Sequence, residues 1–233
     1  MIVGERKPFA EIEEMVKGYK KLIVLGCGTC VAVCHAGGEK EVELLASQLR
    51  MASRMHDEEV KIIEATVQRQ CDREYVEPIT EQARECDAIL SMACGAGVQY
   101  VAEILEPMTV MPALNTRFIG VNLGEGQWSE RCRACGNCML ADYGGICPMT
   151  MCAKSLVNGP CGGYKNGKCE TSSEQDCAWI MIYNRLLKQG RLDLMRDISP
   201  DKDYSAQGHP AKYTAEAYTQ AELSEAGDNH PDT

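Results

Sequence analysis

The chain has little positive charge and few of the residue sets that enzymes use on substrates. It carries 24 Lys and Arg residues against 34 Asp and Glu residues, which gives a net charge of −10. An acidic surface repels phosphates and anionic lipid headgroups, so neither nucleic acid nor a membrane is expected as a partner. The sequence has only four histidines and no Ser-His-Asp set, phosphate-binding loop or paired carboxylates in a glycine loop. The chain is therefore not expected to be catalytic on its own.

Long apolar runs are also missing. The longest stretch without Asp, Glu, Lys or Arg covers residues 22–38, only 17 residues with four glycines among them, which is too short for a spanning helix. Residues 1–7 contain no apolar segment of the secretory type, so a cytoplasmic protein is expected. Cysteine, by contrast, is abundant at 14 residues. Because cytoplasmic thiols are kept reduced, these cysteines are expected to bind metal rather than to form disulfides.

The first half of the chain alternates short apolar runs with helical patterns. The predicted strands are residues 21–26, 60–65, 88–92, 110–111 and 118–121. The predicted helices are residues 8–19, 39–55, 79–84 and 98–105. This alternation indicates an α/β domain over residues 1–122 with right-handed crossovers and a doubly wound parallel sheet of the flavodoxin-like type.

A group of thiols follows the first predicted strand. Cys27, Cys30 and Cys34 lie at its carboxyl end, where open α/β sheets bind ligands. A dinucleotide site is disfavoured because Val31 occupies the position of the third glycine of that fingerprint. The Cys-x2-Cys-x3-Cys run instead presents three thiolates to one soft ion or cluster.

The fourth thiolate of this first site is expected to come from another strand end. Cys94, just after the third strand, is the preferred ligand for a first [4Fe–4S] cluster, and Cys71, just after the second strand, is its competitor. Cys86 precedes the third strand and is expected to be buried packing.

Residues 123–170 differ in kind from the rest. They hold 9 of the 21 glycines and show almost no hydrophobic periodicity, so bound metal rather than apolar burial is expected to order them. A helix around Trp179, with Ser173 and Asp176 as a capping box, is expected to close a metal-binding domain over residues 123–198. Residues 199–233 form a polar, acidic tail, for which a solvated state is favoured over an arm that Tyr204, Tyr213 and Tyr218 would anchor on a partner.

The largest group of candidate metal ligands is a set of eight further cysteines. They are Cys132, Cys135, Cys138, Cys147, Cys152, Cys161, Cys169 and Cys177. The first three form Cys-x2-Cys-x2-Cys, the run that holds three corners of a [4Fe–4S] cluster. A zinc ribbon would need two separate Cys-x2-Cys pairs, and only one such run is present among these eight cysteines. A cluster is therefore expected on the first three thiols, while the later ones stay open between a further cluster and zinc, for a total of two or three clusters.

Several of these motifs together resemble a known family. The Cys147-Pro148 pair, the stretch Asn158-Gly159-Pro160-Cys161-Gly162-Gly163 and the helix that begins Cys177-Ala178-Trp179 are similar to the methylenetetrahydrofolate reductase C-terminal domain. The loop Gly26-Cys27-Gly28-Thr29-Cys30 continues the likeness. Over about residues 1–195 the chain resembles the small iron–sulfur subunits of two-subunit methylenetetrahydrofolate reductases of acetogenic bacteria.

The resemblance implies an electron-transfer role in a complex. The implied partner is a TIM-barrel subunit that holds FMN or FAD and reduces methylenetetrahydrofolate to 5-methyltetrahydrofolate, in the methyl branch of the Wood–Ljungdahl pathway. Ferredoxin or another reduced carrier would supply the electrons. Two alternatives remain: a structural zinc scaffold of a redox complex, and a stand-alone flavodoxin-like reductase with its own flavin.

Overall fold

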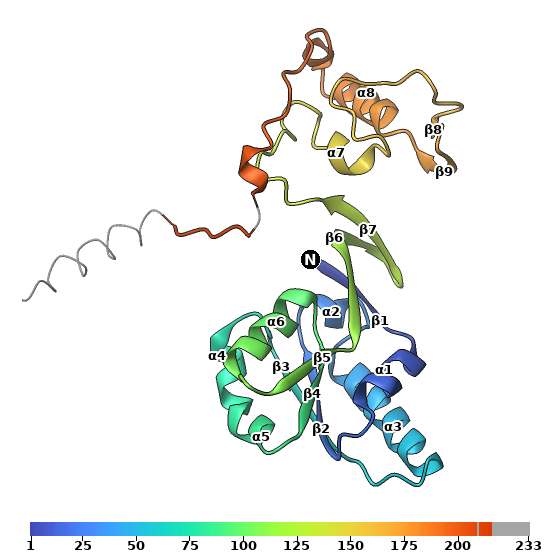
Figure 1. Ribbon diagram of the computed structural model, residues 1–233. Helices are drawn as coiled ribbons and strands as arrows, with labels where there is room; N and C mark the ends of the chain where they lie inside the picture. Colours follow the sequence, from blue (N-terminus) through green and yellow to red (C-terminus); the bar gives the residue numbers. More distant parts are fainter. Residues whose placement is uncertain (209, 216–233) are drawn as a thin grey trace, which may run out of the picture.

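The computed structural model describes residues 1–208 and 210–215. These residues form an α/β lobe and a cysteine-rich lobe, and a β-hairpin lies between the two (Figure 1). Within the described residues, no helix combines the length and the apolar character needed to cross a membrane.

A parallel sheet forms the centre of the α/β lobe. Its strands are β2 (Lys21–Cys27), β3 (Lys61–Val67), β4 (Ala88–Met92) and β5 (Thr109–Pro112), in the order β3-β2-β4-β5. All three neighbouring pairs are parallel. The predicted parallel α/β sheet is therefore confirmed for four strands, and the flavodoxin-like relationship stays a prediction.

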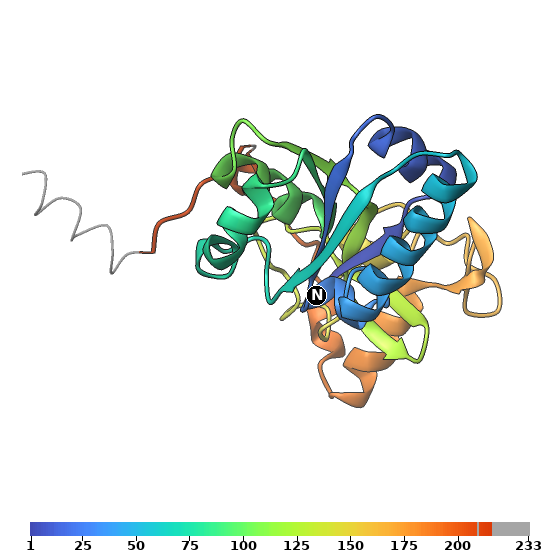
Figure 2. The same cartoon turned by 90° about the horizontal axis from the view of Figure 1, so that it is seen from below.

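Helices cover both faces of this sheet (Figure 2). They are α1 (Phe9–Val16), α2 (Cys30–Val33), α3 (Glu39–Met55), α4 (Arg73–Val76), α5 (Thr80–Arg84), α6 (Gly95–Ile104) and the 3-10 helix Glu77–Ile79. Successive side chains of a strand point to opposite faces of the sheet, and β2 accordingly contributes side chains to two hydrophobic cores. Leu22 and Val24 pack with α3 on one face, whereas Ile23 and Leu25 pack with α5 and α6 on the other. The alternation of apolar runs predicted this arrangement correctly.

A second, antiparallel sheet was not predicted. Its strands are β1 (Ile2–Arg6), β6 (Leu114–Gly124) and β7 (Gln127–Cys132), in the order β1-β6-β7. Residues 118–121 do form a strand, as predicted, but they are part of β6 and belong to this antiparallel sheet, so their expected place in the parallel sheet is wrong. The pairing of β1 with β6 joins segments more than a hundred residues apart, which local sequence patterns do not encode. The expected domain limit at residue 122 falls inside β6.

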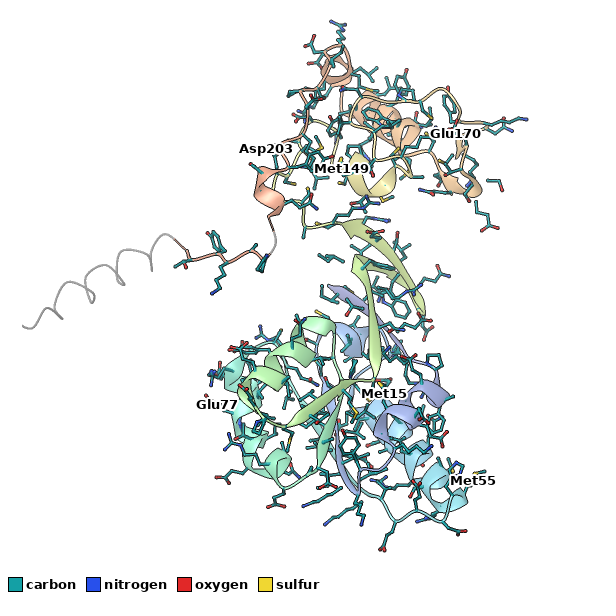
Figure 3. All side chains as sticks on the ribbon, viewed as in Figure 1. Met15, Met55, Glu77, Met149, Glu170 and Asp203 are labelled. Atoms are coloured by element: carbon teal, nitrogen blue, oxygen red, sulfur yellow. The ribbon has the colours of Figure 1, made fainter. Side chains whose placement is uncertain are left out.

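The cysteine-rich lobe contains short elements around one longer helix. They are α7 (Pro148–Met151), β8 (Lys168–Cys169), β9 (Ser172–Asp176), α8 (Ala178–Lys188) and the 3-10 helices Leu192–Met195 and Ser205–Gln207. Tyr143, Ile146, Trp179, Ile182 and Leu186 form a small core under α8. This lobe therefore does bury apolar side chains, Met149 of α7 among them (Figure 3), which the weak periodicity did not predict.

The start of α8 differs from the sequence prediction. Ser173 and Asp176 were expected to form a capping box there, and this is wrong because both belong to β9. Cys177 is the N-cap residue, and no side chain caps the helix. The helix itself was predicted correctly, with Trp179, Ile182 and Leu186 on its buried face.

Candidate metal centres

All fourteen cysteines lie within the described residues, and all are free thiols. Cys86 is 6% exposed, belongs to the core beneath α5, and its Sγ lies 3.6 Å from the Gln82 carbonyl oxygen. Its predicted role as buried packing is confirmed. The other thirteen divide between the edge of the parallel sheet and the cysteine-rich lobe.

Three adjacent strands bring Cys27, Cys71 and Cys94 to one edge of the parallel sheet. Cys27 ends β2 and pairs in register with Val67, the last residue of β3. Cys71 lies in the loop that follows β3, and Cys94 is the N-cap residue of α6, just after β4. Because β2 lies between β3 and β4 in the sheet, the loops with these thiols open at the same edge.

Local contacts bring the loop after β3 against the end of β2. The Gly28 N–H donates to the Val67 carbonyl at 2.9 Å, and the Cys27 Sγ lies 3.9 Å from the Gln68 carbonyl oxygen. Burial raises the pKa of the Cys71 thiol, and the nearby Cys94 and Cys27 side chains raise it further. The three thiols are therefore electrostatic neighbours.

Cys30 and Cys34 lie at the two ends of α2 and have different surroundings. Cys30 is the first residue of this helix and is partly exposed. Cys34 is buried, and its Sγ lies 3.7 Å from the carbonyl oxygen of Ile2 in β1. Burial raises the pKa of the Cys34 thiol. The Cys34 sulfur thus contacts β1, whereas Cys27 contacts the loop that leads to Cys71.

In the cysteine-rich lobe, four thiols line one small cavity beside α8. This cavity set consists of Cys152, Cys161, Cys169 and Cys177. Its members come from the residue after α7, the following loop, β8 and the N-cap of α8. A hydrogen bond from the Thr171 hydroxyl, with an Oγ1–Sγ distance of 3.2 Å, lowers the pKa of the Cys169 thiol.

Trp179 forms one wall of this cavity. Its packing also explains the first glycine, Gly159, of the Asn-Gly-Pro-Cys-Gly-Gly stretch. Its Nε1 donates to the Leu156 carbonyl at 3.1 Å, and its ring meets the Tyr143 ring edge-on at 5.5 Å between centroids. A Cβ at Gly159 would lie only 2.4 Å from the indole ring. The chain before Cys161 can therefore cross the indole closely only with glycine at this position.

The remaining four cysteines of this lobe make up a loop set. They are Cys132, Cys135, Cys138 and Cys147. Cys132 ends β7 and Cys147 is the N-cap of α7, and α7 packs against β7. The loop between them turns tightly, with Ala134 and Gly136 in the left-handed region at φ 51° and 75°. The Ala134 N–H donates to the Cys132 Sγ at 3.3 Å.

Lys202 reaches this loop from residues that were expected to be a solvated tail. Lys202 as a residue is 8% exposed, and its Nζ donates to the Asn137 carbonyl. Burial raises the pKa of the Cys135 thiol, but hydrogen bonds from Lys202 and from the backbone at Asn137 outweigh this effect and leave the pKa below its usual value. Sequence reasoning missed Lys202 because nothing in its local pattern marks a buried residue.

Further contacts hold the same segment on the lobe. The Ser199 N–H donates to Asn158 Oδ1 at 2.8 Å, and the Asn158 side-chain amide donates back to the Ser199 carbonyl at 3.0 Å. The prediction of a solvated tail from residue 199 is therefore wrong for its first residues. Tyr204 and Tyr213 are exposed; Tyr218 and the acidic residues at 216–233 lie outside the described residues.

The thiols at the sheet edge and in the cysteine-rich lobe suit a metal centre that prefers sulfur ligands. Cysteine thiolates are the ligands of iron–sulfur clusters and of many structural zinc sites, and the chain supplies them in sets. Among the described residues, no three His, Cys, Asp or Glu side chains converge as the ligands of a single metal ion do.

Comparison with known proteins gives one match. Residues 111–205 match the family described as "Methylene-tetrahydrofolate reductase C terminal". The matched range covers less than half of the chain, and it includes both the cavity set and the loop set but none of the cysteines at the sheet edge. Neither a curated protein nor a solved structure matches the chain.

Proposed function

We propose that this chain is the electron-transfer subunit of a methylenetetrahydrofolate reductase complex, with [4Fe–4S] clusters bound by its cysteines. The observation that supports this most directly is that all eight cysteines of the cysteine-rich lobe lie within the residues that match the reductase family, four of them around one cavity. Four thiolates are the usual ligand set of a [4Fe–4S] cluster. When bound, such clusters accept and pass on single electrons.

The chain's own residues contribute charge and hydrogen bonds to the loop set. The buried ammonium of Lys202 lies beside Cys135, and the Ala134 N–H donates to the Cys132 sulfur. Positive charge and N–H donors near thiolate sulfur favour the more negative, reduced state of a centre. Both features therefore suit a site that accepts electrons.

The family match also suggests the partner. We propose a TIM-barrel subunit that holds FMN or FAD and reduces methylenetetrahydrofolate to 5-methyltetrahydrofolate in the methyl branch of the Wood–Ljungdahl pathway. Ferredoxin or another reduced carrier would deliver the electrons, and the complex would act in the cytoplasm, where thiols stay reduced. The near absence of substrate-type residue sets on this chain supports the assignment of catalysis to the partner.

A structural zinc site is a second candidate for the cavity set. Cys152, Cys161, Cys169 and Cys177 line one small cavity, and four cysteine thiolates are also the ligand set of many structural zinc sites. Zinc on the cavity set is compatible with a cluster on the loop set. The two candidates therefore use the same thiols and differ only in the metal that the cavity set binds.

The test is anaerobic purification of the full chain, followed by counts of iron, zinc, acid-labile sulfide and flavin. We expect iron and sulfide in equal amounts, with bleaching of the visible absorbance on reduction. Cys135→Ser should lower the iron content, whereas Cys86→Ser, a buried cysteine outside every set, should leave it unchanged. A protein with zinc but no iron would overturn the electron-transfer role, and tight flavin in the isolated chain would favour a stand-alone reductase.

A further inference from the structure

Residues 199–207, which we call the strap, lie against the turn that carries the Cys-x2-Cys-x2-Cys run of the loop set. The strap runs down one side of the cysteine-rich lobe and ends in the 3-10 helix Ser205–Gln207 (Figure 1). Three separate contacts hold it in place, and only one of them involves a cysteine.

The first contact is at the start of the strap. Asn158 exchanges two hydrogen bonds with the backbone of Ser199, at 2.8 and 3.0 Å, and the Ser199 Oγ lies 2.8 Å from the hydroxyl oxygen of Tyr143. Tyr143 is 4% exposed and belongs to the core under α8. The strap thus begins at a fixed point of the lobe. Asn158 itself comes from the loop between Cys152 and Cys161 of the cavity set.

The second contact is the ammonium of Lys202, the one buried residue with a charged side chain in the part of the chain that the structure describes. No Asp or Glu side chain within that part forms an ion pair with it, and its neighbour Asp203 instead accepts a hydrogen bond from the Ser205 N–H at 2.8 Å. A buried charge is costly unless it is paired. The Asn137 carbonyl and the Cys135 sulfur are the groups that compensate it.

The third contact is a close approach of two backbones. Gly136 lies in the left-handed region at φ 75°, and a Cβ there would be only 2.7 Å from the Ala206 carbonyl oxygen. Glycine therefore lets the strap come this near to the turn. Of the three thiols on the turn, Cys135 is partly exposed, whereas Cys132 and Cys138 are exposed. The strap thus covers the middle of the run and leaves its two ends open.

We propose that the strap is a cover for the metal centre of the loop set, anchored on the cavity-set loop, and that it limits the exchange of bound metal with solution. Metal release then requires the strap to open, because the strap covers Cys135 and the turn around it. The ends of the run at Cys132 and Cys138 stay accessible, so a redox partner can approach without moving the strap. The proposal rests on the proposed function only in that the loop set binds a metal.

Limited trypsin digestion of the full, anaerobically purified chain measures the opening of the strap. Lys202 is the single Lys or Arg of the strap, and the exposed Lys212 beyond it offers an internal reference. Asn158→Ala removes both hydrogen bonds to Ser199 and should speed cleavage after Lys202 roughly 5- to 100-fold, with cleavage after Lys212 unchanged. Asn184→Ala, at an exposed position of α8, is the matched control and should change neither rate.

Release of iron to the chelator ferrozine tests the consequence for the metal. The iron that Cys135→Ser removes should be released faster from Asn158→Ala than from the unchanged protein. Lys202→Met should speed it roughly tenfold or more, because hydrogen bonds from charged groups are about twice as strong as neutral ones. Lys202→Arg keeps the charge and should restore slow release, and Lys212→Met is the matched control with no expected effect.

Each outcome decides the proposal. Equal rates of cleavage after Lys202 in Asn158→Ala and in the unchanged protein overturn the cover, and so does equally fast iron release from the two. Unchanged far-ultraviolet circular dichroism shows that the variants fold, and Lys202→Met tests the strap without touching the cavity-set loop. Unchanged iron content in Cys135→Ser would instead contradict the proposed function and leave the trypsin result standing.

Discussion

The buried hydrogen bonds of Gln70 offer a quantitative test of how the sheet edge is held together. Gln70→Leu keeps the volume but leaves the Ser91 hydroxyl without its acceptor and removes the donor to the carbonyls of Leu25 and Gly26. A buried polar group that loses its partner costs roughly 1–3 kcal/mol. Both carbonyls lie in β2, which has a neighbouring strand on each side and so offers other hydrogen-bond donors. We therefore expect a total loss of about 2–4 kcal/mol, less than three full penalties.

Hydrogen exchange of the intact protein measures this loss without removing any bound metal. Amides of β2 and β4 should exchange roughly 30- to 1000-fold faster in Gln70→Leu, the factor that corresponds to that free energy. Amides of α8 belong to a separate core and provide an internal reference that should not change.

A double-mutant cycle checks the physical cause. Ser91→Ala removes one of the three hydrogen bonds and should cost about 1–3 kcal/mol. The double variant should cost less than the sum of the two single variants, because the Gln70–Ser91 bond is then counted once. Strict additivity, or a Gln70→Leu effect below about 0.5 kcal/mol, would refute the role assigned to Gln70.

Two further predictions concern charge and pH. Lys202→Met should lower the midpoint reduction potential, followed by the visible absorbance, because it removes a positive charge beside Cys135. Lys202→Arg should keep the potential of the unchanged protein. An equal potential in all three proteins would contradict this prediction. Burial raises the pKa of the Cys86 thiol, so its contribution to stability is complete below the unfolded thiol pKa and is lost as pH rises through the higher folded value. Mass spectrometry after alkylation at about pH 8.5, near the unperturbed thiol pKa, should find Cys86 unmodified in the folded chain and modified in urea; rapid labelling of the folded chain would count against burial.

Local sequence patterns predicted the elements whose cause is local. The strand at residues 88–92 and the helix at 39–55 have the bounds that their apolar patterns indicate. Such patterns work because a buried strand needs a continuous apolar run and a surface helix needs one apolar face. They missed β1 and found only residues 118–121 of β6, because these two strands are only partly buried and depend on each other across the length of the chain.

The candidate sites divide in the same way. Their abundance of thiols is visible in the sequence, and a Cys-x2-Cys run brings two thiols together through local geometry alone. The grouping of distant thiols could not be predicted, and neither could the return of Lys202 onto the loop set, since both depend on contacts between segments far apart in sequence.

The sequence by itself thus determined the α/β alternation and the two regions rich in thiols. Only the tertiary structure decided which thiols are neighbours. The strand order β3-β2-β4 brings Cys71 and Cys94 to either side of Cys27, and α8 gathers four thiols around its first turn. The physical reason is that strand order and helix packing are set by the burial of apolar faces in the folded chain, so cysteine spacing alone does not specify them.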